Sequence, residues 1–366
     1  MKTFQCQCGN SIFFRNSRCA SCDRLLGYAP GINTMTALEP GTDGCWQVPN
    51  AGRVRGATFR LCRNYADHDV CNWLIPVDQP DAFCFACRLN RVTPNLSHPR
   101  HPALWYRLET AKRHMLYTLL DLGLPVVGRD RDPQQGLAFD FLSDRDTDSE
   151  FTEPLIGADP VSTGHLNGII TINLAEADEV ARARMQAQMG ENYRTLLGHF
   201  RHEIGHYYWS LLIERGGRVA EFRDLFGDER ADYAQSLQRH YQEGPPADWS
   251  RYAITAYATA HPWEDWAESW AHYMHMTDTL DTALQFQFVP PRPWRERLEE
   301  FDTMMHAWTR LATGMNAINR SMGLSDAYPF VLQEGPARDK LAFIHDVIRA
   351  ATATREGARP PIFGSA

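Results

Sequence analysis

One short stretch of the chain combines the residue types of a catalytic metal site. His202 and His206 stand four positions apart, and Glu203 directly follows the first histidine. Positions four apart lie on one face of a helix, so both imidazoles can bind one ion while Glu203 reaches a water molecule on it. Zinc lowers the pKa of such a water and polarises a carbonyl, and a neighbouring carboxylate takes up the proton. The pattern therefore predicts a zinc-dependent hydrolase with Glu203 as general base.

Catalytic zinc usually has three protein ligands and an open position for water, so a third ligand is needed. The best source is the segment from His261 to His272, where Pro262 suits the first turn of a helix. Glu264 and Glu268 lie one turn apart on one face of that helix. We expect one carboxylate to bind the metal and the other to hold a ligand imidazole by its second nitrogen; the spacing permits either order. The alternative is an exposed acidic face on a helix anchored by tryptophans.

The cysteines indicate further metal sites, because all nine precede residue 88. The N-terminus also lacks the apolar run of a secretory signal, which favours metal binding over disulfides. Two sets of four thiolates can each close a tetrahedral structural zinc site. His68 is an alternative ligand in the second set, and we expect the remaining Cys45 to be an ordinary buried thiol. The first set is Cys6, Cys8, Cys19 and Cys22, and the second is Cys62, Cys71, Cys84 and Cys87.

The residues of the predicted catalytic site fall in segments with helical character. Residues 191–215 indicate a long helix ended by two glycines, and residues 263–280 indicate another. The β-branched stretch 168–174 predicts a strand that could pair with an extended substrate. His199, one turn before the first metal histidine, is expected to be a packed or supporting residue rather than a ligand. Helical spacing also marks residues 105–122, 293–315 and 338–351, whereas residues 134–160 are acidic and rich in turn formers.

Composition and length set the expected organisation. With 366 residues, of which 43% are hydrophobic, the chain suits two domains. We place a zinc-ribbon module in residues 1–95, with its two sites in about 1–30 and 40–95, and a catalytic domain in residues 96–366. No stretch is apolar enough to span a membrane. Together with the missing secretory signal, this predicts a cytoplasmic protein without a membrane partner.

Charge bears on nucleic-acid binding, which zinc ribbons often mediate. The chain has a net charge of −8. Residues 1–100 carry 11 Lys and Arg against 7 Asp and Glu. A zinc ion bound by four thiolates has a net negative charge, so two such sites would cancel this positive excess. Binding of nucleic acid through the ribbon is thus an option that charge does not favour. Structural stapling or protein recognition is the expected role of the module.

These motifs together resemble a bacterial family of zinc-binding metallopeptidases with an N-terminal zinc-ribbon domain. The resemblance spans nearly the whole chain and implies an α+β fold with a mainly helical, zincin-like domain of the gluzincin type. In gluzincins, a glutamate of the second helix is the third ligand and an acidic residue four positions later supports the site, which matches Glu264 and Glu268. The segments that carry the resemblance are residues 6–10, 84–90, 163–168, 198–209, 261–268 and 319–323.

Zincins also need a donor for the oxyanion that develops on the substrate, usually a tyrosine or histidine. Tyr257 stands seven residues before Glu264, a spacing found in some gluzincin-like toxins. Tyr252, His165 and Tyr328 compete for this role, and each of these aromatic residues could instead be packed in the core.

The resulting prediction is a zinc metallopeptidase that acts on a peptide or protein substrate. One catalytic and two structural zinc ions are expected, with Glu203 as base and then as proton donor to the leaving amine. The main alternative is a zinc-ribbon interaction or nucleic-acid-binding protein whose HExxH domain is catalytically silent. An intact Glu203 favours the enzyme, since metal binding alone does not need it. Hydrolysis of a non-peptide amide would use the same residues.

Overall fold

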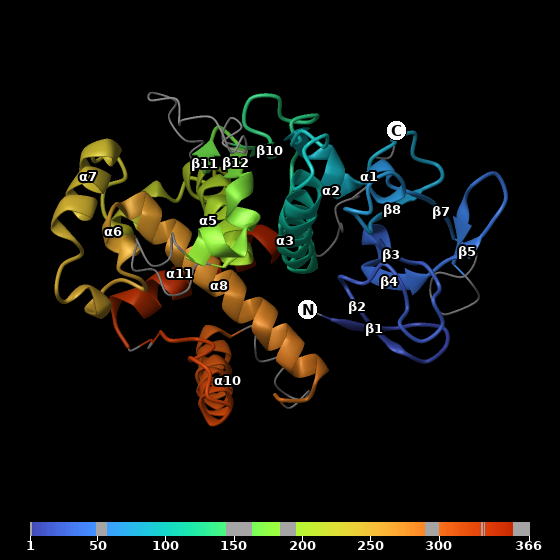
Figure 1. Cartoon of the computed structure of the whole chain (residues 1–366). Helices are drawn as coiled ribbons and strands as arrows, with labels where there is room; N and C mark the ends of the chain where they lie inside the picture. The colour runs from blue at the N-terminus through green and yellow to red at the C-terminus, as the bar shows by residue number, and fades with distance from the viewer. Residues whose placement is uncertain are drawn as a thin grey trace, which may run out of the picture. The chain divides into compact units, whose positions relative to one another are not determined.

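The computed structural model describes residues 2–48, 57–143, 163–183, 195–289, 300–330, 332 and 334–353. Two compact units are present, one made of residues 3–200 and the other beginning at residue 201 (Figure 1). Short strands dominate the cysteine-rich region and helices dominate the rest, which confirms the predicted α+β class. None of the helices in the described ranges is long and apolar enough to cross a bilayer.

The N-terminal part of the first unit consists of short antiparallel strands. Strands of two to four residues bury little apolar surface, so they need further stabilisation from a core or a metal ion. A small apolar core is present and includes Leu38, Phe59 and Leu74. The pairs are β1 (Thr3–Gln5) with β2 (Ser11–Phe13) and β3 (Leu26–Ala29) with β4 (Thr34–Ala37), and a further sheet has the order β5 (Glu39–Pro40), β6 (Trp46–Gln47), β7 (Thr58–Leu61), β8 (Leu74–Pro76).

A four-stranded sheet follows, with the order β11-β12-β10-β9. The central strand β10 (Ala138–Leu142) runs parallel to both neighbours, β12 (Ile169–Asn173) and β9 (Asn90–Val92). Strand β11 (Gly164–Leu166) forms a hairpin with β12. The hairpin turn places Asn167 and Gly168 at φ of 48° and 81°, a left-handed conformation that asparagine and glycine tolerate best. The strand predicted for residues 168–174 is thus present as β12. Its expected pairing with an extended substrate is wrong, because β12 lies inside the sheet and already pairs with β11 and β10.

Strand β9 joins the cysteine-rich region to this sheet. It lies only three residues after Cys87, which ends the second cysteine set, and it follows the short helix α2 (Phe85–Arg88). Helix α3 (His101–Asp121) packs against α2 and corresponds to the helix predicted for residues 105–122. The sheet therefore combines strands from both sides of residue 95. The proposed module boundary at that position stays a prediction.

The second unit is helical and is organised around α8 (Pro262–Gln285), which packs against α6, α10 and α11. Trp266 and Trp270 of α8 are fully buried, as expected for the tryptophan face of this helix. Helices α8 and α11 confirm the segments predicted at 263–280 and 338–351. Residues 293–299 of a third predicted helix lie outside the described residues. The other helices are α1 (Arg63–Ala66) in the first unit, and α6 (Val219–Phe226), α7 (Tyr233–Glu243), α10 (Phe301–Ser321) and α11 (Pro336–Ala353) in the second.

Helix α5 (Leu196–Tyr208) carries His202 and His206 and continues as a π-helical segment, Trp209–Glu214. It begins within the first unit and ends within the second. The helix predicted for residues 191–215 is therefore present from residue 196, and residues 191–194 lie outside the described ranges. Single π-helical turns occur often beside functional sites, because they change which face a side chain occupies.

Candidate metal centre

A close approach of α5 and α8 builds the centre. The indole Nε1 of Trp266 donates a hydrogen bond of 2.9 Å to the carbonyl of Gly205. A Cβ at Gly205 would lie 3.1 Å from the Cα of Ala267 and 3.2 Å from the side chain of Trp270. Glycine at this position lets the two helices approach closely. The contact brings the first turn of α8, which contains Glu264, to the histidines of α5.

His202, His206 and Glu264 form a buried group whose ligand atoms all lie within 4.8 Å of one another. The Nε2 atom of His202 lies 2.9 Å from Glu264 Oε2, and the Nε2 atom of His206 lies 3.6 Å from Glu264 Oε1. Ligand atoms of a tetrahedral zinc ion lie about 3.3 Å apart, given bonds of about 2.0 Å. Glu264 is 1% exposed, and its Oε2 atom lies against the Nε2 atom of His202. Two imidazoles and one buried carboxylate fit a zinc ion.

The electrostatics of the group favour a cation among its donor atoms. Burial lowers the pKa of His202, but hydrogen bonds to Glu264 and Glu268 outweigh burial and raise it well above its usual value. Burial also lowers the pKa of His206, and for this residue burial outweighs the raising effect of the nearby glutamates. Burial raises the pKa of Glu264, but the two neighbouring histidines outweigh burial and hold this pKa below its usual value. An ionised carboxylate in a dry pocket needs a positive partner, which a proton or a metal ion can supply.

Glu268 lies on the other side of the same imidazole. Its Oε1 atom is 2.6 Å from Nδ1 of His202, and its Oε2 atom accepts a hydrogen bond of 2.7 Å from the hydroxyl of Thr255. Glu264 is 1% exposed, so the alternative of an exposed acidic helix face is wrong. The structure thus groups Glu264 with both Nε2 atoms and places Glu268 where it can orient His202.

The remaining predicted catalytic residues lie at different distances from this group. Glu203 is 4% exposed and influences the pKa of His206. Tyr257 begins a 3-10 turn (Tyr257–Thr259), and its ring centre is 6.0 Å from that of His202. Its role as oxyanion donor stays a prediction.

The side chains of two competitors of Tyr257, Tyr328 and His165, have partners elsewhere in the structure, whereas the contact of Tyr252 involves its backbone carbonyl and not its phenol. The hydroxyl of Tyr328 lies 2.7 Å from Nδ1 of His272. His165 Nε2 accepts the backbone N–H of Gly168 in the β11–β12 turn. The carbonyl of Tyr252 accepts a hydrogen bond from Lys340.

Sequence reasoning missed two residues of the site, Tyr233 and Thr255. The hydroxyl of Tyr233 donates a hydrogen bond of 2.7 Å to Glu264 Oε1. In the sequence both residues lie between α5 and α8, Tyr233 at the start of α7 and Thr255 outside the helices and strands, where no metal-binding motif marks them. His199, by contrast, does not belong to the group of His202, His206 and Glu264, which agrees with the expectation that it is not a ligand. Its Nδ1 atom bonds to the carboxylate of Glu176, and it belongs to none of the metal-binding groups among the described residues.

Both predicted cysteine sets are assembled in the first unit. In the first set, Sγ atoms lie 3.7 Å apart between Cys6 and Cys22 and 3.6 Å apart between Cys8 and Cys19. These distances match the roughly 3.8 Å between sulfurs around a tetrahedral zinc ion and greatly exceed a disulfide bond of about 2.05 Å. Cys45 is free and partly exposed, so its expected burial is wrong.

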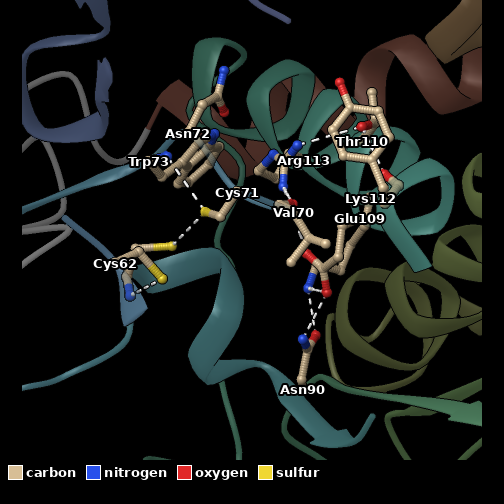
Figure 2. Close-up of polar contacts among 12 residues, drawn as sticks. Cys62, Val70, Cys71, Asn72, Trp73, Asn90, Glu109, Thr110, Lys112 and Arg113 are labelled. Atoms are coloured by element: carbon tan, nitrogen blue, oxygen red, sulfur yellow. Dashed lines mark hydrogen bonds and ion pairs between the residues drawn. The ribbon is translucent and has the colours of Figure 1, made fainter. Parts of the chain in front are cut away.

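The second set, Cys62, Cys71, Cys84 and Cys87, is fully buried. Backbone N–H groups point at two of its sulfurs, from Cys84 to Cys62 Sγ at 3.3 Å and from Trp73 to Cys71 Sγ at 3.4 Å. Arg113 of α3 lies nearby and donates to the carbonyl of Val70 (Figure 2). Burial opposes the charge of Arg113, but Cys71 and its neighbours raise the arginine pKa. A buried cation beside four thiolates offsets part of their negative charge. His68 is exposed and does not belong to the group.

Helix α3 adds a second buried polar group beside this set. Lys112 and Glu109 are both fully buried and form an ion pair of 2.9 Å. Asn90 of β9 bonds to both of them (Figure 2). These contacts tie α3 to the strand that follows the second cysteine set.

Comparisons with known proteins agree with this division of sites. A zinc-ribbon domain family matches residues 3–98, and a family described as "Putative zinc-binding metallo-peptidase" matches residues 101–347. Proteins of Mycobacterium bovis and Mycobacterium tuberculosis, described as uncharacterized, are 40% identical over 354 residues, which covers 95% of this chain and 95% of each relative. No solved structure matches the chain. The chain belongs to the zinc-binding metallopeptidase family, in the form that carries an N-terminal zinc ribbon.

Proposed function

We propose that the chain is a zinc-dependent peptidase of the gluzincin type. The observation that supports this most is the buried group of His202, His206 and Glu264, with Glu203 next to it on α5. These three residues would hold the ion. A zinc ion there would polarise the substrate carbonyl and lower the pKa of a water molecule. The two cysteine sets would hold structural zinc and would take no part in the reaction.

The reaction also depends on proton transfers by the protein. Glu203 is the base that takes a proton from the attacking water and then gives it to the leaving amine. Because Glu203 is buried, its carboxylate interacts with the reacting groups in a medium of low polarity, where charge effects are strong. Glu268 keeps His202 oriented through Nδ1, and Thr255 in turn holds Glu268. Tyr257 is the proposed donor to the oxyanion that forms on the substrate.

The test is the change Glu203→Gln, which keeps the shape of the side chain and removes the base. We expect zinc content near that of the unchanged protein and turnover lower by about 100-fold or more. Glu214→Gln is the matched control, since Glu214 is exposed at the end of the same helical stretch. Cleavage is measured on an unbiased peptide library by mass spectrometry, and metal content is measured on the same samples.

Two results would contradict the proposal. Full activity of the Glu203→Gln protein would remove Glu203 from the mechanism. No cleavage of any library peptide by the zinc-loaded unchanged protein would favour the alternative, in which the metal domain is silent and the ribbon binds a partner.

A further inference from the structure

Helix α7 (Tyr233–Glu243) begins with a tyrosine that contacts a metal-binding carboxylate. The hydroxyl of Tyr233 donates to Glu264 Oε1 at 2.7 Å. Glu264 is 1% exposed, whereas Tyr233 is 40% exposed, so the phenol reaches from the surface into the buried site. A carboxylate in a dry pocket gains most from such a fixed donor.

Two aromatic contacts and a capping histidine fix the position of Tyr233. Its ring packs edge to face against His261, at 5.2 Å between ring centres, and against Trp263, at 6.2 Å. His261 caps α8, because its Nδ1 atom accepts the backbone N–H of Trp263. A neutral imidazole that accepts through Nδ1 donates through Nε2, and this atom lies 3.1 Å from the carbonyl of Ala231. The start of α7 is thereby tied to the start of α8, where Glu264 lies.

The two oxygens of Glu264 have different surroundings. Oε1 accepts a hydrogen bond from the hydroxyl of Tyr233, whereas Oε2 lies 2.9 Å from His202 Nε2. We propose that Tyr233 is a positioning residue for the metal: it holds Oε1 so that Glu264 binds the ion through Oε2 alone. This inference rests on the proposed metal site and does not require peptide hydrolysis.

The direct test is Tyr233→Phe, which removes the hydroxyl and keeps the ring contacts with His261 and Trp263. Residues that orient a ligand change metal affinity by about 10- to 100-fold, so we expect a loss of this size at the catalytic site. Tyr241→Phe is the matched control, because it makes the same chemical change on the same helix at a residue that is 58% exposed. Its zinc affinity should equal that of the unchanged protein.

Zinc affinity is measured by competition with a chromophoric chelator on the full chain. A second readout is the visible absorption of Co²⁺ introduced at the catalytic site while the cysteine sites remain loaded with zinc. A change in how Glu264 binds the ion alters this spectrum, whereas a general loss of stability does not. Circular dichroism of the metal-free proteins establishes that the variants are folded.

The inference is overturned if Tyr233→Phe keeps both the zinc affinity and the cobalt spectrum. It is also overturned if the variant binds zinc normally but has a lower kcat at saturating zinc, since Tyr233 would then act on the substrate. If the variant loses affinity while the unchanged protein cleaves no peptide, the positioning role stands and the proposed peptidase activity fails. The two proposals are therefore tested separately.

Discussion

Glu264 and Glu268 lie one turn apart on α8 and contact opposite nitrogens of one imidazole. The first lies 2.9 Å from His202 Nε2 and the second 2.6 Å from Nδ1. A carboxylate on Nδ1 fixes the tautomer and the ring orientation, which leaves Nε2 as the metal-binding atom. Thr255 adds a third link, because its hydroxyl donates to Glu268. The effect of each residue on the metal should therefore decrease along this series.

We predict that Glu264→Ala abolishes zinc binding at the catalytic site. Glu268→Ala should weaken binding by about 10- to 100-fold, because it removes orientation but no ligand atom. Thr255→Val should have the smallest effect, since it keeps the volume and removes one hydrogen bond. Titration of each variant with zinc measures the series. A larger loss for Glu268→Ala than for Glu264→Ala would make Glu268 the ligand.

At this scale, the sequence could predict the residues that share a short motif. The spacing of His202, Glu203 and His206 is visible in any helix, whereas the choice between Glu264 and Glu268 needed the family resemblance. Tyr233 could not be predicted, because its contact with Glu264 spans 31 positions and depends on how α7 folds back. No local pattern encodes such a contact.

Among the elements, α8 carries two histidines with lowered pKa values, of which His272 is buried and His275 is partly buried. Burial lowers the pKa of His272 to about 4 and that of His275 to about 3. His272 Nδ1 lies 2.7 Å from the hydroxyl of Tyr328, which suits a neutral ring that accepts a hydrogen bond. The histidines bind protons more weakly in the folded chain than in the unfolded chain. Above pH 6.5 these histidines are neutral in both states and do not reduce the free energy of unfolding. As the pH falls from 6.5 towards 4, the unfolded chain binds protons first and the free energy of unfolding decreases.

We predict that acidification from pH 7 to pH 5 destabilises the unchanged protein more than His272→Gln. The difference attributable to this histidine should be about 2 kcal/mol by pH 5, given the lowered pKa. Urea midpoints at both pH values measure it, and loss of zinc affects both proteins alike. His306→Gln, at an exposed position of α10, is the control and should keep the full pH dependence. An equal pH dependence for His272→Gln would contradict a buried, neutral His272.

The elements that the sequence predicted are those with a clear period or cap. Helix α8 has Pro262 in its first turn, and the β-branched run of β12 follows an Asn-Gly turn. Strand β10 was missed, because Ala138–Leu142 lies within a stretch rich in acidic and turn residues. Helices α6 and α7 were not predicted individually. Each is amphipathic but at most 11 residues long, so its period repeats over only two to three turns.

At the scale of the molecule, three separate groups of side chains within the described residues have the composition of zinc sites. The cysteine groups differ in exposure: Cys8 is exposed, whereas all four residues of the second group are buried. Thiolate sites of this kind stabilise a fold directly, because the unfolded chain has no preformed site. The group of His202, His206 and Glu264 instead has three protein donors, the number expected for the proposed catalytic ion.

We predict about three zinc ions per chain, of which two remain after the double change His202→Ala, His206→Ala. Elemental analysis after gel filtration measures this count. A matched variant, Cys84→Ser, should lose the ion of the second cysteine set. It should also unfold more readily, because that site is buried within the first unit. One ion in the unchanged protein would mean that the cysteines are ordinary thiols.

Strand β9 has a consequence for attempts to study the catalytic region by itself. It covers one side of β10, whose residues Ala138 to Phe141 are buried. A fragment that begins at residue 96 would lack β9 and would expose the backbone N–H and C=O groups of β10 along a short apolar edge. Such edges pair with copies of themselves, so this fragment should form aggregates where the full chain stays dispersed.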